Sequence, residues 1–416
     1  MKQLIFTLFF VGWYCFAEGQ EKNTLWRGEF EIGEMRIPFR FELLDSADDR
    51  GFVVFVNGLR RDSFSFSRQG DLIHIDLSLY DAEIRASEGI TGQLSGWYRR
   101  QTVSGTQQLS FIAHPLQVVD SVGATDIVLS GQWTLAVNGE DQARVLLLEQ
   151  SGKRLRGVVH TVTGDSRELE GELTDSSFYL SGFTGSKPVY LSGKLLPEGA
   201  LEGRLGWEPD RIHAFAGQRS AAGASILPDP YHLTSLKPEF DNIDFSFPDL
   251  EGRMVSLSDE QFRDKVVVIE ILGSWCPNCI DQIRFLAPWY RANKDRGVAI
   301  IGVGFELKDD LAFAQKTLGR LRDQLDITYP LLFGGYADKA LAAEKFPALS
   351  QVLAFPTTII LDKKGNVRYI HTGYASESTG NYYTTYINEF NATIDALLSE
   401  PRLDLEGQSP VSNLKN

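Results

Sequence analysis

The feature that most constrains this chain is a Cys-x-x-Cys pair between two segments of different hydrophobic pattern. Val266–Leu272 is apolar apart from Glu270, which is typical of a buried strand, and residues 280–287 carry apolar side chains at helical spacing. Cys276 and Cys279 therefore lie at the start of a helix, where unpaired N–H groups and the positive end of the dipole stabilise a thiolate. Because a thiolate attacks disulfides, the pattern predicts a redox-active pair.

The third cysteine and the spacing of possible metal ligands argue against a metal or haem site at this pair. The chain has three cysteines, and Cys15 lies in a leader-like segment, so a mature chain would keep Cys276 and Cys279. A zinc site needs two further ligands, and the sequence has no second cysteine pair and no close pair of histidines. A covalent haem site needs His after Cys279, where Ile280 stands. We expect no metal and no bound cofactor, and a lone inert disulfide is the remaining alternative.

Residues 1–17 have the pattern of a secretory signal peptide. A positive residue precedes the apolar run Leu4–Phe16, and the small residue Ala17 follows it. The run is too short to span a bilayer as a helix. We expect cleavage near Ala17 and export to the periplasm. The alternative is a lipid anchor on Cys15, which is disfavoured because the two residues before it are large.

Length and charge set the size class and exclude one group of partners. At 416 residues the chain should hold two or three domains. Its net charge is −14, and no run of lysine and arginine interrupts the acidic background. A protein that binds nucleic acid carries a basic patch, so we expect no nucleic-acid partner.

The first half of the chain is predicted to be all-β and internally duplicated. Short strand-like runs alternate with turn pairs such as Asn57-Gly58. Trp26 matches Trp133 and Phe111 matches Phe215, at a spacing of about 106 residues. Two copies predict two similar antiparallel β units, each a small up-and-down barrel or a sandwich. Such a barrel can hold a ligand in its mouth, but we favour a spacer or docking role because no polar cluster marks a pocket.

After residue 222 the pattern changes to alternating strands and helices, which is typical of an α/β sheet. The predicted organisation is a signal peptide at 1–17, β units at 20–120 and 121–222, a linker at 223–242, an α/β domain at 243–400 and a polar tail at 401–416. Within the α/β domain we expect a helix after Cys279, hairpins within 245–257 and 357–370, strands at 266–272 and 298–303, and helices at 309–325, 340–346 and 382–398.

Four motifs of the α/β domain occur together: Asp249-Leu250-Glu251-Gly252, Gly273-Ser274-Trp275-Cys276-Pro277-Asn278-Cys279, Phe355-Pro356-Thr357 and the late Gly373. In this combination, residues 243–400 resemble the exported thioredoxin-like proteins of the TlpA/ResA type. The resemblance covers under half of the chain. It implies a thioredoxin-like α/β fold and a thiol–disulfide oxidoreductase activity.

The resemblance also implies roles for the residues that match its motifs. Cys276 would be the exposed nucleophile and Cys279 the resolving thiol. Trp275 and Pro277 would flank the reactive sulfur, and Phe355-Pro356 would form a cis-proline loop whose backbone pairs with a substrate. The alternatives are ordinary packing for Trp275 and a trans proline that opens a strand for Pro356.

Glu270 is the predicted proton acceptor for Cys279. An isolated acid in an apolar strand is costly unless it is used, and burial would raise its pKa toward the range of a thiol. Its position resembles that of the buried acid in thioredoxin-like proteins, and the alternative is a strand-edge glutamate that faces water. Related envelope proteins often carry an acid just after the second cysteine. Here Asp281 is a weak candidate for that role, because Gln282 cannot carry a proton.

The leading hypothesis is an exported thiol–disulfide oxidoreductase that reduces disulfides of cysteine-containing proteins in the cell envelope. The resemblance implies that a membrane thiol-transfer protein would supply the electrons. A peroxidase of the peroxiredoxin type is disfavoured, because Gly273 stands where that group carries threonine. A non-enzymatic alternative gives the main role to the β units, which would bind a ligand or an envelope component, with the thioredoxin-like domain as a redox-sensitive attachment.

Overall fold

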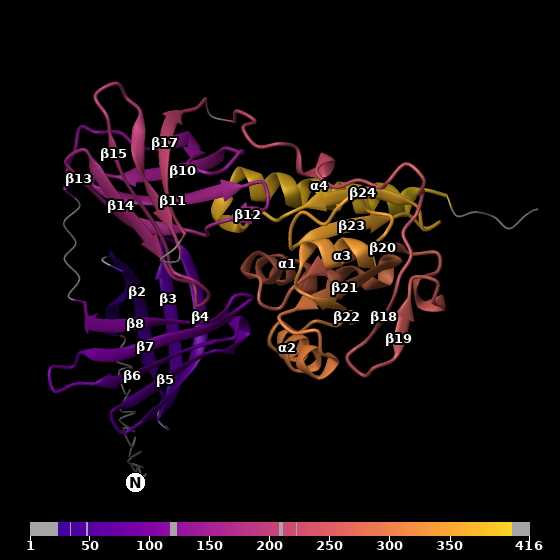
Figure 1. Cartoon of the computed structure of the whole chain (residues 1–416), viewed down its shortest axis with the longest axis horizontal. Coiled ribbons are helices and arrows are strands. Elements are labelled where there is room, and N and C mark those ends of the chain that lie inside the picture. The colour runs from indigo at the N-terminus through magenta and orange to yellow at the C-terminus, as the bar shows by residue number, and fades with distance from the viewer. Residues whose placement is uncertain are drawn as a thin grey trace, which may run out of the picture.

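The computed structural model describes residues 24–33, 35–46, 49–116, 123–207, 211–221 and 223–401. The predicted signal peptide with Cys15, and the predicted tail beyond residue 401, lie outside the described residues. Figure 1 shows two β barrels stacked on one side of the molecule and an α/β domain beside both of them. The chain is therefore multidomain, as predicted.

The first barrel is a meander of eight strands that closes on itself. Each strand pairs antiparallel with the next, and β1 also pairs with β8, which removes the open edges of the sheet. Its strands are β1 (Thr24–Ile32), β2 (Met35–Asp45), β3 (Arg50–Asn57), β4 (Arg60–Gln69), β5 (Leu72–Leu77), β6 (Ala82–Glu88), β7 (Leu94–Thr102) and β8 (Gly105–Pro115). Alternate side chains point into the barrel, so each strand reads as alternating buried and exposed residues.

The second barrel repeats this plan with one short additional strand. The pairings run β10-β9-β17-β16-β15-β14-β13-β11, and the β10–β11 pairing closes the ring while β12 extends β11 into a hairpin. Its strands are β9 (Gly131–Val137), β10 (Arg144–Ser151), β11 (Arg154–Thr161), β12 (Gly164–Asp165), β13 (Leu169–Thr174), β14 (Ser177–Gly182), β15 (Val189–Leu195), β16 (Leu201–Gly206) and β17 (Ile212–Arg219).

The predicted duplication is confirmed by the positions of the matching aromatic residues. Trp26 and Trp133 lie on the first strands of their barrels, and Phe111 and Phe215 lie on the last strands. Of the two architectures that the sequence left open, the structure has barrels. In each barrel the first strand pairs with the last, β1 with β8 and β9 with β17, and local sequence patterns do not encode such long-range pairing.

The two barrels interlock through Phe183, in the loop that follows β14. The ring of Phe183 is fully buried inside the first barrel, with its centroid 4.8 Å from that of Phe30 and 4.9 Å from that of Phe55. The side-chain amide of Asn57 donates to the carbonyl of Phe183 and accepts from its N–H, both at 2.9 Å. The interior of the first barrel is thus filled by aromatic rings, one of which the second barrel supplies.

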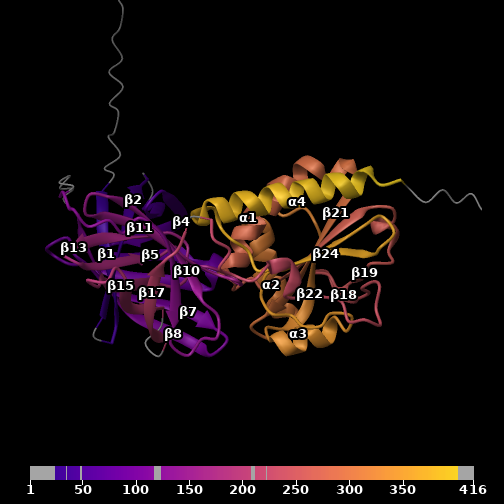
Figure 2. The ribbon, with the colours of Figure 1, turned by 90° about the horizontal axis from the view of Figure 1, so that it is seen from above.

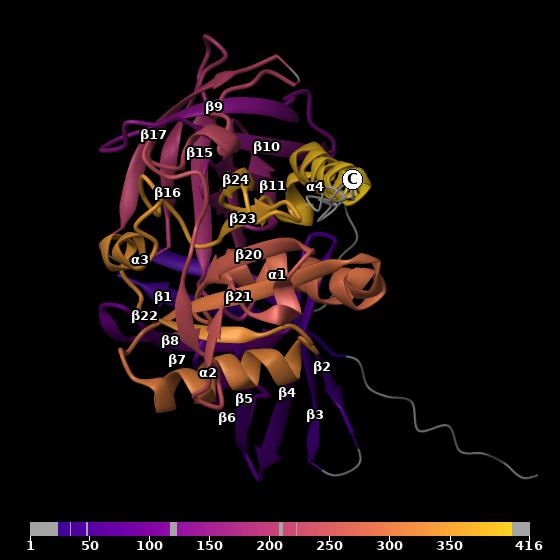
Figure 3. The ribbon, with the colours of Figure 1, turned by 90° about the vertical axis from the view of Figure 1, so that its right-hand side faces the viewer.

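The α/β domain is built on a five-stranded sheet of order β22-β21-β20-β23-β24. β20, β21 and β22 are parallel, and β23 and β24 run antiparallel to their neighbours. Figure 3 shows these strands in that order. The elements are β18 (Ser246–Pro248), β19 (Met254–Ser256), β20 (Val266–Leu272), α1 (Pro277–Asn293), β21 (Val298–Glu306), α2 (Leu311–Gln324), β22 (Leu331–Tyr336), α3 (Lys339–Lys345), β23 (Thr357–Leu361), β24 (Val367–Thr372) and α4 (Asn381–Ser399).

The helices cover both faces of this sheet, with α1 and α4 on one side and α3 on the other (Figure 2). Helices α1 and α4 pack through aromatic rings, because Phe285 and Trp289 both contact Phe390. Five short 3-10 helices are η1 (Ser78–Tyr80), η2 (Pro230–His232), η3 (Glu260–Phe262), η4 (Lys294–Arg296) and η5 (Glu377–Thr379). None of the helices in the described residues combines the length and apolar character that crossing a bilayer requires.

The predicted linker packs on the α/β domain. Leu236 forms a bridge with Leu349 and Asn242 with Asn366, and η2 lies against β24. Residues 223–242 therefore help to fix the α/β domain beside the barrels, which is what places the cysteine pair at their surface.

Candidate active site

The two cysteines occupy the start of α1, as the sequence predicts. Cys276 is the residue that caps the helix, and its Sγ accepts a hydrogen bond from the N–H of Cys279 at 3.3 Å. Pro277 is the first helical residue, where its missing N–H costs no hydrogen bond. Both thiols are free, and Cys279 is completely buried one turn further in.

The environment separates the two thiols in acidity. Burial alone would raise the pKa of Cys276, but hydrogen bonds from the thiol and N–H of Cys279, with the positive charge of Arg167, bring it below its ordinary value. Burial raises the pKa of Cys279 well above its ordinary value, and the hydrogen bond and charge of Cys276 add to this effect. Cys276 is therefore suited to be the nucleophile, and Cys279 needs a proton acceptor before it can react.

Glu270 lies on β20, fully buried beside this pair. Its pKa is raised to about 8, mainly by burial and also by the negative charge of Cys276, against a hydrogen bond from Tyr329 that lowers it. The hydroxyl of Tyr329 donates to Oε2 at 3.4 Å, while Oε1 has no partner among the described residues. The negative charge of Glu270 also raises the pKa of Cys279, so the two groups interact electrostatically. The structure thus brings Glu270 together with the cysteines.

The predicted proline loop lies against the nucleophile. The Phe355–Pro356 peptide bond is cis, as the resemblance implied. The carbonyl of Phe355 accepts a hydrogen bond from Sγ of Cys276 at 3.3 Å. Trp275 packs edge-on against the Phe355 ring, and its Nε1 donates to the carbonyl of Phe305 at 2.9 Å.

A second buried acid, Glu306, was missed at the sequence level. It ends β21 and accepts hydrogen bonds from the N–H and hydroxyl of Ser274 at 2.9 and 2.6 Å, and from the hydroxyl of Thr317 at 2.9 Å. Burial raises its pKa to about 7 despite these bonds. Glu306 fixes the turn before the cysteines. The available signal was weaker than for Glu270, because Glu306 stands at the end of its apolar strand and beyond the expected range 298–303.

The prediction that Cys276 is exposed is wrong, because the barrels cover it. Cys276 is 5% exposed in the complete chain. Arg100, on β7 of the first barrel, donates to the carbonyl of Trp275 at 3.2 Å, and Arg167 of the second barrel donates to the carbonyl of Pro277 at 2.6 Å. These carbonyls flank the nucleophile on either side.

The β11–β12 hairpin completes the cover. Gly164 approaches Asn278 so closely that no β-carbon fits between them, and a β-carbon on Gly373 would lie 2.7 Å from the carbonyl oxygen of Val162. The carboxylate of Asp165 accepts hydrogen bonds from the N–H and hydroxyl of Ser376 at 2.7 and 2.9 Å. The hairpin therefore spans from the cysteine turn to the segment after β24.

An ion cluster ties α1 to both barrels. We call it the interdomain ion cluster, and its members are Arg60, Asp62, Arg167, Asp281 and Arg284. Asp281 lies 2.7 Å from both Arg60 and Arg167. Burial alone would raise the pKa of Asp281, but the charges of Arg167, Arg60 and Arg284 hold it well below its usual range. Asp281 stays ionised and is unsuited to the proton-carrying role that the sequence left open for it.

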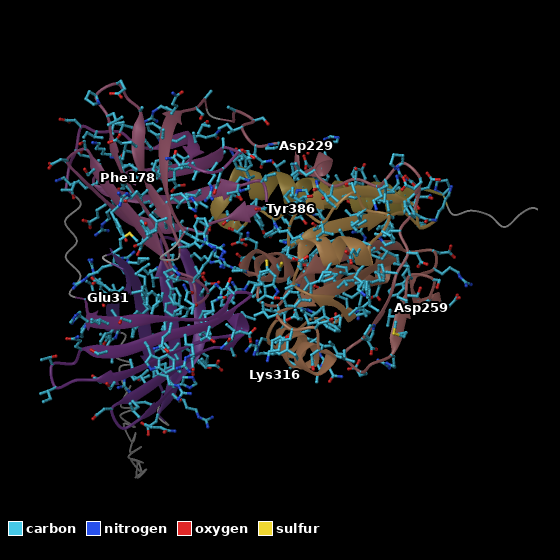
Figure 4. The ribbon with its side chains drawn as sticks, in the orientation of Figure 1. Glu31, Phe178, Asp229, Asp259, Lys316 and Tyr386 are labelled. Atoms are coloured by element: carbon cyan, nitrogen blue, oxygen red, sulfur yellow. The ribbon has the colours of Figure 1, made fainter. Side chains whose placement is uncertain are left out.

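A separate cavity of about 860 Å³ lies between the second barrel, residues 223–231 and α4. Tyr386, labelled in Figure 4, lies on the side of the α/β domain that faces the barrels. Within the described residues, neither cysteine lines this cavity. Its aromatic lining comes from His160, Tyr231, His371, Tyr374, Tyr382 and Tyr386.

Comparisons with known proteins show which proteins this chain resembles. Residues 238–386 match the family model described as Redoxin. The chain is 28% identical over 130 residues to the thioredoxin-like protein YneN of Bacillus subtilis (strain 168), covering 31% of this chain and 68% of YneN. It is also 28% identical over 130 residues to the thiol-disulfide oxidoreductase ResA of Geobacillus kaustophilus (strain HTA426), covering 31% of this chain and 66% of ResA. A solved structure of a thiol-disulfide oxidoreductase from Bacteroides fragilis NCTC 9343 aligns at 19% identity and a TM-score of 0.28, covering 36% of this chain and 99% of that one.

The fold, the cysteine pair and the curated relatives define the class: the C-terminal part of this chain is a thiol–disulfide oxidoreductase domain of the thioredoxin-like type. Within that class it is a TlpA/ResA-like protein, as its motifs indicated. The family model does not reach the two barrels, which end at Arg219.

Proposed function

We propose that the whole protein is an exported thiol–disulfide oxidoreductase that reduces disulfides of envelope proteins through Cys276 and Cys279. The observation that carries this proposal is the position of the pair: Sγ of Cys276 caps α1 and accepts from the N–H of Cys279, which is fully buried one turn further in. Cys276 has a lowered pKa at the helix start, and Cys279 has a raised pKa beside the buried acid Glu270.

In the first step, the thiolate of Cys276 attacks one sulfur of the substrate disulfide. A bond forms between Cys276 and that sulfur, the substrate disulfide breaks, and the second substrate sulfur leaves as a thiolate that takes up a proton. Trp275, Pro277 and the cis-proline loop surround Cys276, so they are the residues that a substrate would contact. A protein substrate has to displace the hairpin cover, since Cys276 is 5% exposed.

In the second step, Cys279 passes its proton to Glu270 and attacks the sulfur of Cys276. This closes the Cys276–Cys279 disulfide and releases the first substrate sulfur as a thiolate that takes up a proton, so two electrons have moved from the enzyme to the substrate. The order of events follows from charge. While Cys276 is a thiolate it raises the pKa of Glu270, and once Cys276 is part of a mixed disulfide that charge is gone. Glu270 then ionises more readily, at the moment when a base is needed.

The oxidised enzyme requires a reductant. Following the family resemblance, we assign this role to a thiol-transfer protein of the membrane. Export to the periplasm rests on the leader-like pattern of residues 1–17, with a lipid anchor at Cys15 as the alternative.

The test is reduction of two disulfides by the full-length reduced protein, insulin as a protein substrate and DTNB as a small one. We expect both to be reduced, Cys276→Ser to be inactive, and Cys279→Ser to accumulate a dithiothreitol-sensitive adduct on Cys276. Reduction of both at the normal rate by Cys276→Ser would overturn the proposal. Reduction of DTNB without insulin would restrict it to small disulfides.

The cavity between the second barrel and α4 favours one other function, the binding of a ligand by the β units together with the α/β domain. The barrel interior that contains Phe183 is filled with aromatic rings, so this cavity is the better candidate for such a site. A Tyr382→Ala variant that loses a ligand-induced rise in Tm, while keeping disulfide reduction, would support that function. If Tyr382→Ala lost both the rise in Tm and disulfide reduction, ligand binding would not be independent of the cysteines.

A further inference from the structure

Arg167 occupies an unusual position for a cation. It follows β12 of the second barrel, yet its guanidinium is buried against the start of α1. It donates to the carbonyl of Pro277 at 2.6 Å, to the carboxylate of Asp281 at 2.7 Å and to the hydroxyl of Thr184 at 3.1 Å. All three guanidinium nitrogens of Arg167 are therefore hydrogen-bonded.

The location has two physical costs. The start of a helix carries partial positive charge, which favours anions and disfavours a buried cation. The backbone of Arg167 also has a φ of 62°, in the left-handed region that favours glycine. The carboxylate of Asp165 accepts a hydrogen bond from the N–H of Arg167 at 2.7 Å and holds this backbone conformation. The buried guanidinium still needs an anion beside it to offset the cost of burial.

Asp281 alone does not account for this arrangement. Asp281 is already in contact with Arg60 and Arg284, and the interdomain ion cluster holds three arginines against two aspartates. The cluster thus has one positive charge in excess. Arg167 is its only member that the structure bonds to the backbone of the cysteine turn, one residue after Cys276.

We propose that Arg167 is a positioning residue for the thiolate of Cys276, so that the second barrel completes the active site of the thioredoxin-like domain. Its guanidinium holds the carbonyl of Pro277, the residue after Cys276, and so places a positive charge beside the turn that carries the thiolate. The inference rests on the proposed function, in which Cys276 is the nucleophile. The lowered pKa of Cys276, to which the charge of Arg167 contributes, agrees with it.

Other charged groups lie around Cys276 and Arg167. Cys279 on α1 and Glu270 on β20 interact with Cys276. On its other side, Arg167 faces Asp281 and Arg60, and its guanidinium lies 5.6 Å from the ring centre of Tyr80. Arg100 of the first barrel is the other cation at this turn, since it donates to the carbonyl of Trp275 at 3.2 Å. Arg167 is the cation among the main influences that lower the pKa of Cys276.

The experiment measures thiolate absorbance at 240 nm against pH in the reduced full-length protein, because this readout does not depend on access to the sulfur. In Arg167→Gln we expect the thiolate fraction of Cys276 at pH below the wild-type midpoint to fall on the order of tenfold. Arg167→Lys, which keeps the charge, should restore most of it. Arg60→Gln is the matched control, because it removes another arginine from Asp281 without touching the cysteine turn, and the thiolate fraction should fall much less in it than in Arg167→Gln.

Asp281→Asn provides a test in the opposite direction that leaves Arg167 in place. Removing the competing carboxylate should raise the thiolate fraction, and this variant decides the matter should Arg167→Gln fail to fold. The inference is overturned by unchanged titration in Arg167→Gln, by an equal fall in Arg60→Gln, or by unchanged titration in Asp281→Asn. Disulfide reduction is assayed separately. A titration that responds as expected in a protein without turnover would uphold the role of Arg167 and reject the proposed function.

Discussion

Glu270 and Glu306 are two buried acids with different surroundings. Glu306 accepts three hydrogen bonds from Ser274 and Thr317, whereas Glu270 accepts one long bond from Tyr329 and interacts with the cysteines. A carboxyl group with few internal partners keeps the capacity to exchange a proton. Glu270 therefore has the features of a base for Cys279, and Glu306 those of a structural group.

We predict that Glu270→Gln slows the second chemical step on the order of a hundredfold, the range typical of a lost general base. With DTNB, attack by Cys276 and attack by Cys279 each release one coloured thiolate, so stopped-flow absorbance separates the two steps. The first phase should remain unchanged. Glu306→Gln is the matched control and should leave the second phase intact, and an equal slowing in both variants would contradict the assignment.

Glu270 should also make folding stability depend on pH. Folding raises its pKa from an ordinary value near 4.5 to about 8, so in this range the folded state keeps a proton that the unfolded state has lost. Stability from this group is complete below pH 4.5 and is lost as the pH rises through 8. Relative to Glu270→Gln, the wild type should lose roughly 4 kcal/mol of unfolding free energy over this window. Urea denaturation at intervals from pH 5 to 9 measures the unfolding free energy of both proteins. If the two free energies changed in parallel with pH, the prediction would be contradicted.

At the residue scale, the sequence was informative wherever chemistry was local. The cysteine pair and Glu270 could be predicted because one begins a helix and the other interrupts an apolar strand, whereas the cis-proline loop was expected from the family resemblance alone. Arg100 and Arg167 could not, because they reach the site across more than 100 residues of chain. Because the sequence does not reveal these contacts from the barrels, it predicted that Cys276 is exposed.

At the scale of elements, the β11–β12 hairpin packs against the cysteine turn, and we expect it to limit access to the nucleophile. Its contact with η5 depends on Asp165, which accepts from the N–H and the hydroxyl of Ser376. The loss of one hydrogen bond to a charged group costs about 1.5 kcal/mol. Small changes here should therefore alter how often the cover opens.

We predict that Ser376→Ala speeds alkylation of Cys276 by iodoacetamide about tenfold, since it removes the hydroxyl bond to Asp165. The rate is followed by mass spectrometry at a pH at which Cys276 is fully ionised, so that acidity does not contribute. Ser378→Ala is the control, because Ser378 lies in η5, the short helix that follows Ser376, and this variant should react as the wild type does. Equal rates in all three proteins would show that the hairpin does not limit access.

Most elements of the α/β domain could be predicted from periodicity. The expected strand at 266–272 coincides with β20, and the expected helices at 309–325, 340–346 and 382–398 correspond to α2, α3 and α4. Strand β22 was missed, because Pro330 precedes it and two glycines, Gly334 and Gly335, interrupt its apolar pattern. Its place in the sheet comes from pairing with β21.

At the scale of the whole molecule, Phe183 joins the barrels into one unit. We predict that Phe183→Ala costs about 3–5 kcal/mol and separates the unfolding of the first barrel from that of the rest, because it empties a site that the second barrel fills. Phe178→Ala, in the core of the second barrel (Figure 4), is the matched control and should lower stability without splitting the transition. Urea unfolding followed by tryptophan fluorescence distinguishes the two, and a single transition in both variants would contradict the interlock.

Both barrels precede the cysteines along the chain. Their rings close without any residue beyond Arg219, and domains generally fold from the N-terminal end as a chain is made. Barrel assembly can therefore finish before either sulfur emerges. The barrels that cover the cysteine turn are then already folded when the two cysteines are made. We expect this order to limit premature oxidation to the time that α1 needs to dock.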